Sequence, residues 1–240
     1  PANKLSQVYT GSTLTSGLQN GEGYVVVDAG GVYVGTYTVT VSLDGGNYIW
    51  SDGTTAAKTY TYKITPSENS EEIVTTYNAI YGALLKDVVT LPAGVEGTWS
   101  IEGFDTLTVG NAGTNTFVAV FEPDEHGDYI RREVTITINV QKATVTAPTI
   151  DPDKLSQTYT GNKLTSGLTV AEGALYSIVD NGGTNVGTYY ATLSLIDPAN
   201  YKWDTTGKSD AIQLKYVIQR AQITFTDDIA IEGWIYGTTA

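Results

Sequence analysis

The stretch KLSQVYTGSTLTSGL at residues 4–18 returns almost unchanged as KLSQTYTGNKLTSGL at residues 154–168. Three of the 15 positions differ, and they are Val8/Thr158, Ser12/Asn162 and Thr13/Lys163. A catalytic loop is seldom needed twice in one chain, whereas a structural module is often copied in tandem. The duplication therefore predicts a chain of repeated modules.

The correspondence continues beyond this stretch. Gly35–Leu43 matches Gly187–Leu195, and Asn47–Trp50 matches Asn200–Trp203. A more divergent copy lies between them, with Gly113–Val120 as its counterpart strand. One tyrosine marks each copy, at spacings of 72, 78 and 77 residues: Tyr9, Tyr81, Tyr159 and Tyr236. We therefore predict segments of two alternating types: 1–67 (type A), 68–145 (type B), 146–222 (type A) and 223–240, the start of a truncated type B segment.

The residue pattern within each segment is that of short β-strands. Val and Thr alternate at residues 38–41, and Ile and Thr alternate at 135–138, as in strands with one buried face and one solvated face. No stretch has convincing helical periodicity, and the nearest, 77–89, is interrupted by Gly82. A period of about 75 residues exceeds a solenoid repeat and suits a sandwich of about seven strands. We predict an all-β fold of tandem immunoglobulin-like β-sandwich repeats in an elongated array.

Composition and charge narrow the function classes. The 240 residues carry a net charge of −13 and include no cysteine and no methionine. Disulfides and thiolate metal sites are excluded, and a surface of this sign repels nucleic acids and anionic lipids. No apolar run reaches the length of about 18–20 residues that spans a bilayer. We expect an internal fragment of a longer polypeptide, monomeric, that binds no nucleic acid and does not insert into a membrane.

The ordered motifs resemble a known family. Tyr81-Gly82-Ala83, the later Gly-x-Tyr strand, the Asn-Tyr turn and a closing strand that runs into Lys142-Ala143 resemble MBG-type immunoglobulin-like repeats. The type A segments depart from this pattern because Thr10 or Thr160 stands between the Tyr and the Gly. The resemblance implies an extracellular location, on a bacterial cell surface or cell wall or secreted, and it supplies no catalytic residues.

Polar residues that could carry chemistry lie beside turns or joints. Acidic pairs occur at Glu71-Glu72, Asp124-Glu125, Asp151/Asp153 and Asp227-Asp228. We interpret them as solvated turn residues, with a weak Ca²⁺ site at a joint as the alternative. The one histidine, His126, lies in the turn-like stretch EPDEHGDY and is interpreted as a surface residue. We therefore predict no enzyme activity, no catalytic residue, no cofactor and no metal ligand. Lys4 and Lys154 raise the separate hypothesis of internal isopeptide bonds.

The aromatic residues leave two function hypotheses open. The chain has 17 Tyr and 4 Trp, and the recurrence of Tyr48/Trp50 as Tyr201/Trp203 favours packing over ligand binding. Trp99 and Trp234 have no such counterpart and are the candidate ligand contacts. The leading hypothesis is a set of non-catalytic spacer repeats that form a semi-rigid stalk of a bacterial surface protein or adhesin, with the other domains of that protein as partners. The alternative is an adhesin module that binds a glycan or a host protein through exposed Tyr and Trp.

Overall fold

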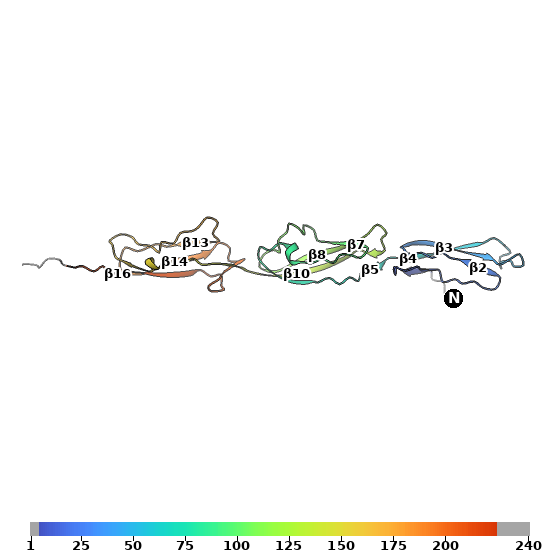
Figure 1. Ribbon diagram of the computed structural model, residues 1–240, viewed down its shortest axis with the longest axis horizontal. Coiled ribbons are helices and arrows are strands. Elements are labelled where there is room, and N and C mark those ends of the chain that lie inside the picture. Colours follow the sequence, from blue (N-terminus) through green and yellow to red (C-terminus); the bar gives the residue numbers. More distant parts are fainter. Residues whose placement is uncertain (1–4, 225–240) are drawn as a thin grey trace, which may run out of the picture. The chain divides into compact units, whose positions relative to one another are not determined.

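The computed structural model describes residues 5–224, and the regular secondary structure of this part of the chain is almost entirely β-strand (Figure 1). The prediction of an all-β fold is confirmed. Contacts divide the chain into two compact units, residues 1–141 and 142–240. No helix within residues 5–224 is long and apolar enough to cross a membrane.

Unit 1 begins with a four-stranded sheet, called the first sheet. Its strands are β1 (Ser6–Val8), β2 (Tyr24–Val27), β3 (Gly35–Leu43) and β4 (Lys58–Thr65), in the order β1-β4-β3-β2. β1 runs parallel to β4, and the other pairs are antiparallel. Along β3 the buried side chains are those of Val39 and Val41, while Thr38 is exposed and Thr40 is half-buried, as the alternation predicted.

The rest of unit 1 contains the second sheet and a small pair of strands. The second sheet comprises β6 (Thr76–Ile80), β7 (Gly97–Ser100), β8 (Gly113–Pro123) and β10 (Arg132–Gln141), in the order β6-β10-β8-β7. The pair comprises β5 (Ser67–Glu68) and β9 (Tyr129–Ile130), which run parallel. The core behind the second sheet includes Leu85, Val109, Phe121, Ile136 and Ile138, each fully buried.

Unit 2 has the same strand order as the first sheet. Its third sheet comprises β12 (Ser156–Thr158), β13 (Tyr176–Val179), β14 (Gly187–Leu195) and β16 (Ile212–Gln219), in the order β12-β16-β14-β13. A parallel pair, β11 (Ala143–Val145) with β15 (Tyr201–Trp203), lies beside it. The registers also correspond, since Tyr37 faces Tyr62 across β3 and β4, and Tyr189 faces Tyr216 across β14 and β16.

The predicted segments fall largely within these two units. Unit 1 contains the segment 1–67 and most of 68–145, and the segment 146–222 lies in unit 2. Residues 142–145 fall in unit 2 because β11 pairs with β15 there. Of the segment 223–240, only residues 223 and 224 are described. The division into four repeats stays a prediction.

Two short helices occur where none was predicted. α1 (Leu85–Val88) and α2 (Pro152–Leu155) each have four residues. At α2 the Asp151 side chain accepts a hydrogen bond from the Asp153 N–H, and Pro152 occupies the first turn. This cap is a local start signal that Asp151-Pro152 already carries in the sequence. The helix is too short to show periodicity.

The duplicated stretch serves the fold through buried polar side chains. Asp28 accepts hydrogen bonds from the Ser16 N–H (2.7 Å), the Gly30 N–H (3.0 Å) and the Tyr62 hydroxyl (3.1 Å). In unit 2 the same network joins Asp180 to Ser166 (2.6 Å), Gly182 (2.9 Å) and Tyr216 (2.8 Å). The serine of the recurring Thr-Ser-Gly therefore donates its backbone N–H to a carboxylate that also accepts from a tyrosine of the sheet, which holds the loop against the sheet.

Two glycines are required by the same arrangement. A Cβ atom on Gly31 would lie 2.1 Å from the ring of Tyr37, and one on Gly183 would lie 2.0 Å from the ring of Tyr189. The ring of each tyrosine lies over its glycine, and the hydroxyl donates to a backbone carbonyl, of Tyr33 at 2.8 Å or of Asn185 at 2.9 Å. These Gly-Tyr contacts close the loop that precedes β3 and β14.

Acid should weaken unit 2 through Asp180. Burial raises the pKa of this carboxyl, but the hydrogen bonds from Ser166, Tyr216 and Gly182 outweigh burial and place the pKa below its ordinary value. A carboxyl with a lowered pKa stabilises the fold fully above its unfolded pKa of about 3.9, and this contribution is lost as the pH falls through the folded pKa.

We expect Asp180→Asn to lower the free energy of unfolding of unit 2 by about 1–3 kcal/mol at pH 7, because an amide NH₂ must then face a donor. The deficit should shrink as the pH approaches 3. Urea denaturation across this pH range measures both quantities, with the exposed Glu172→Gln as control. An Asp180→Asn variant as stable as the parent at pH 7 would show that the network is not needed.

Candidate functional site

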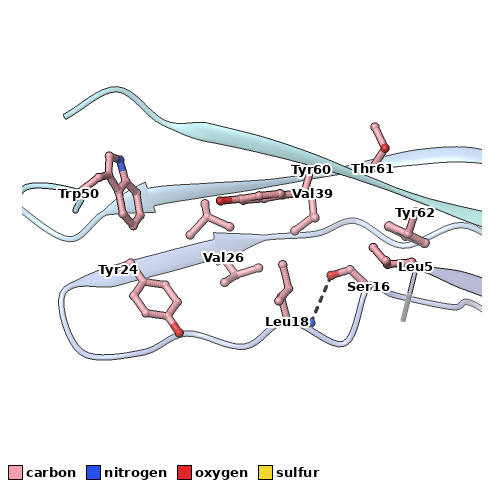
Figure 2. Close-up of a pocket in the computed structure, with 11 residues that line it drawn as sticks. Leu5, Ser16, Leu18, Tyr24, Val26, Val39, Trp50, Tyr60, Thr61 and Tyr62 are labelled. Atoms are coloured by element: carbon pink, nitrogen blue, oxygen red, sulfur yellow. Dashed lines mark hydrogen bonds between the residues drawn. The ribbon is translucent and has the colours of Figure 1, made fainter. Parts of the chain in front are cut away.

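An apolar groove opens over the first sheet of unit 1, and Figure 2 shows it in close-up. Its volume is about 320 Å³. The lining residues are Leu5, Ser16, Leu18, Tyr24, Val26, Val39, Val41, Trp50, Tyr60, Thr61 and Tyr62. No carboxylate, histidine or lysine belongs to this lining. The groove is therefore suited to binding an apolar or aromatic surface and not to acid–base chemistry.

The strands of the first sheet hold the walls in place. Val26 of β2, Val39 of β3 and Tyr60 of β4 lie side by side in the groove because every second side chain of a strand points to the same face (Figure 2). Leu18 covers them from the loop before β2, where its N–H donates to the Ser16 hydroxyl at 3.2 Å. Tyr60 remains 49% exposed, so the groove is open along this wall.

Trp50 and Tyr24 form one end of the groove (Figure 2). The Trp50 indole N–H donates to the Ala56 carbonyl at 2.8 Å, and the Lys58 ammonium lies 5.4 Å from the ring centroid. Lys58 is itself paired with Asp52 at 2.6 Å, a contact that lowers the pKa of this carboxyl. These contacts fix the orientation of the Trp50 ring, which is half-buried.

The corresponding position in unit 2 is filled by the chain itself. Val145 and Ala147, both nearly buried, pack against Leu193 and Trp203 in one hydrophobic cluster. Partly buried side chains complete the cluster: Leu168, Tyr176, Ile178, Tyr201, Ile212 and Leu214. As a result Trp203 is fully buried, whereas its counterpart Trp50 is not.

The groove residues and the filled cluster match position by position. The matching pairs are Leu18/Leu168, Tyr24/Tyr176, Val26/Ile178, Val39/Ala191, Val41/Leu193, Trp50/Trp203 and Tyr60/Leu214. Strand registers support this assignment, since Val26 faces Val41 in the first sheet and Ile178 faces Leu193 in the third. The groove is therefore the place that β11 and the residues just after it occupy in unit 2.

The second sheet has the same kind of strand, and we call β5 and β11 the lead-in strands. The Ser67 N–H donates to the Asp128 carbonyl at 2.9 Å, and the Ala143 N–H donates to the Asn200 carbonyl at 3.0 Å. Each lead-in strand thus joins the strand that begins at the tyrosine of an Asp-Tyr or Asn-Tyr pair. Within the described residues, no strand pairs with the matching Asn47–Trp50 of the first sheet.

The ligand contacts proposed from the sequence lie elsewhere. Trp99 is only 8% exposed and packs against Phe121, with its indole N–H donating to Glu71 at 2.9 Å and Arg132 over its ring. Little of this ring is available to a ligand. Trp234 lies outside the described residues. Trp50, which recurrence assigned to packing, lines the groove of the first sheet, and Trp99 contributes to a separate hollow beside Leu91 and Phe104.

The acidic residues noted in the sequence have separate surroundings. Burial raises the pKa of Glu71, but hydrogen bonds from Trp99 and Asn69 outweigh burial and place the pKa below its ordinary value. Asp151 caps α2, and Asp227-Asp228 lie outside the described residues. Lys154 is exposed, and Lys4 is outside the described part, so isopeptide bonds stay a hypothesis. His126 lies in an exposed turn, as predicted.

Comparisons with known proteins leave the family open. No protein-family model matches the chain, and no curated protein matches it. A solved structure titled as the Bacteroides ovatus mixed-linkage glucan utilization locus SGBP-B in complex with a mixed-linkage heptasaccharide is similar at 9% sequence identity and a TM-score of 0.17. The match covers 90% of this chain and 66% of that chain.

The difference between the two tryptophans predicts unequal effects of the same substitution. Replacing the fully buried Trp203 by Ala should cost about 3–5 kcal/mol of unfolding free energy, the usual range for a buried aromatic. Trp50→Ala should cost about half of this or less, because its ring already faces an open groove. Urea unfolding followed by circular dichroism measures both values. Equal costs would contradict the interpretation of the groove as open.

Proposed function

We propose that the chain is a non-catalytic spacer of a bacterial surface or secreted protein, in which each β module is completed by the strand that leads into it. The MBG-like motifs of the sequence support the surface location, and the immunoglobulin-like form of the modules belongs to the same proposal. The observation that carries the proposal is the match between the open groove of the first sheet and the filled cluster of unit 2.

The lead-in strand suits this role for two physical reasons. Its backbone satisfies an otherwise unpaired strand edge, which is costly to leave open in a folded protein. Its alternate side chains enter an apolar groove, as Val145 and Ala147 do in unit 2. Burying one valine side chain contributes about 1.5–3 kcal/mol, so the strand is a substantial part of the module that it completes.

The connections that supply the lead-in strands are short. β4 ends at Thr65 and β5 begins at Ser67, while β10 ends at Gln141 and β11 begins at Ala143. One residue separates the last strand of one sheet from the lead-in strand of the next. Such a connection has no flexible Gly/Ser tract. This continuity favours a spacer function, since no flexible linker separates one module from the lead-in strand of the next.

For the first sheet we assign the groove to a strand of the same type, supplied by polypeptide N-terminal to Leu5. In unit 2 the residues that fill the cluster are Val145 and Ala147, in the stretch Lys142-Ala143-Thr144-Val145-Thr146-Ala147 ahead of the KLSQ stretch. By the same numbering offset of 150, the matching positions fall ahead of Pro1. The spacer proposal thus names the chemistry of the occupant: an extended strand with small apolar residues at alternate positions.

A glycan is the second candidate occupant. The specific observation in its favour is the partly exposed aromatic lining, Tyr24, Trp50 and Tyr60, because aromatic faces stack on sugar rings. The strand is favoured over the glycan because in unit 2 the matching place is already filled by Val145 and Ala147 of the chain itself.

A chain that carries a copy of residues 142–150 ahead of Pro1 tests the proposal. We expect this extension to raise the unfolding free energy of the first sheet by about 2 kcal/mol, by burying the valine that matches Val145. The emission of Trp50 should shift to shorter wavelength as its ring leaves solvent. Differential scanning calorimetry and fluorescence measure the two effects.

Two control chains make the result specific. The same extension with Asp at the position that matches Val145 should change neither the stability nor the emission. The unaltered extension in a Trp50→Ala background should give no fluorescence shift. If the extension leaves stability and emission unchanged while a mixed set of oligosaccharides quenches Trp50, the groove binds glycan and the strand assignment is wrong.

A further inference from the structure

The turn between β8 and β9 of unit 1 gathers three side chains that can bind a metal ion. Asp124, His126 and Asp128 each place one ligand atom within 4.8 Å of the other two. Among residues 5–224, no other group of three or more His, Cys, Asp or Glu side chains brings its ligand atoms within this distance. The stretch DEHGD has the composition of an ordinary polar turn, so its residues were interpreted as solvated, with a weak Ca²⁺ site as the alternative for Asp124-Glu125.

The backbone of the turn places the three side chains together. The His126 N–H donates to the Asp124 carboxylate at 3.0 Å, and the Gly127 N–H donates to the Asp124 carbonyl at 3.1 Å. Gly127 has a φ of 65°, in the left-handed region that glycine adopts without strain. The His126 Nδ1 atom thereby comes to 3.5 Å from the Asp124 Oδ2 atom.

Asp128 supplies an independent observation that points to a ligand. Its side chain is 1% exposed, and its Oδ1 atom accepts a hydrogen bond from the Val34 N–H at 2.6 Å. Its Oδ2 atom is buried and has no hydrogen-bond partner. A carboxyl oxygen that is buried without a hydrogen-bond partner is costly, and such oxygens are normally paired or bound to a cation.

The histidine ring is also held in place. It stacks on the ring of Tyr33, with the centroids 4.5 Å apart and the planes 17° from parallel. The carbonyl of Tyr33 in turn accepts the Tyr37 hydroxyl at 2.8 Å. A stacked imidazole loses less rotational freedom on binding a metal than a free one does, so the ring is partly preorganised as a ligand.

We propose that Asp124, His126 and Asp128 bind a divalent ion of the Zn²⁺ class. One imidazole nitrogen and two carboxylate oxygens form a mixed donor set that suits Zn²⁺, whereas Ca²⁺ takes six to eight oxygens. Tetrahedral ligands at about 2.0–2.1 Å from zinc lie roughly 3.4 Å apart, so small rotations of the exposed Asp124 and His126 side chains complete the site. The fourth position is left to water.

The ion would brace two parts of unit 1. Asp128 contacts Val34 through its side chain, and its carbonyl accepts the Ser67 N–H of the lead-in strand β5. His126 contacts Tyr33, which precedes β3 of the first sheet. A metal at this turn therefore stiffens the contact between the first sheet and the strand pair β5–β9. This inference stands on the turn alone and does not rest on the proposed strand complementation.

Isothermal titration of the full chain with ZnCl₂ in a non-chelating buffer tests the proposal. We expect one Zn²⁺ per chain, with at least tenfold weaker binding in His126→Gln and in Asp128→Asn. Asp128→Asn retains an oxygen that can accept from Val34, so it separates loss of metal from loss of the contact. Because His126 is the one histidine of the chain, its ring resonances in NMR report this site directly.

The matched control is Asp153→Asn, an exposed acid of α2 with no histidine in its part of the chain, which should bind Zn²⁺ like the parent. CaCl₂ should give at least tenfold weaker binding than ZnCl₂. The proposal is overturned by unchanged His126 resonances in the presence of Zn²⁺, by unaltered binding in His126→Gln, or by a Ca²⁺ affinity equal to that for Zn²⁺.

Discussion

The rest of the structure depends on one interaction, the pairing of a lead-in strand with the strand that begins at the tyrosine of an Asp-Tyr or Asn-Tyr pair. In β5–β9 and β11–β15 it is made by the same kind of backbone hydrogen bond, from Ser67 to Asp128 and from Ala143 to Asn200. In unit 2 it also delivers Val145 and Ala147 to the hydrophobic cluster, where they bury Trp203. Without this strand, the first sheet presents a groove at the matching place.

The sequence predicted the parts of the fold that depend on local pattern. Alternation identified the long strands β3 and β14, and the duplicated stretch correctly indicated that its residues serve structure, as Ser16 and Ser166 do in binding Asp28 and Asp180. The alternation of apolar and polar residues did not indicate which strand pairs with which sheet. Ala143–Val145 alternates apolar and polar residues like the preceding strand, with the apolar positions shifted by one residue, and only its pairing with Tyr201–Trp203 places it in unit 2.

The candidate sites were harder to predict because they depend on which strand covers a sheet and on which side chains, distant in the sequence, lie close together in space. Recurrence correctly indicated packing for Trp203 but not for Trp50. The residue is the same, but only Trp203 is covered by a lead-in strand. Trp99 has no counterpart, yet Phe121 and Glu71 bury it. His126 was recognised as a turn residue, but the buried oxygen of Asp128 follows from a contact with Val34, 94 positions away in the chain.

Amide hydrogen exchange at Ser51 tests the central claim most directly. In unit 2 the Asp204 N–H donates to the Val145 carbonyl at 3.0 Å, and Ser51 occupies the matching position after Trp50 in the first sheet. The account predicts that a copy of residues 142–150 placed ahead of Pro1 slows exchange at Ser51 by tenfold or more, equivalent to about 1.4 kcal/mol, while Asp204 stays protected in both chains. Equal exchange at Ser51 with and without the added strand would contradict it.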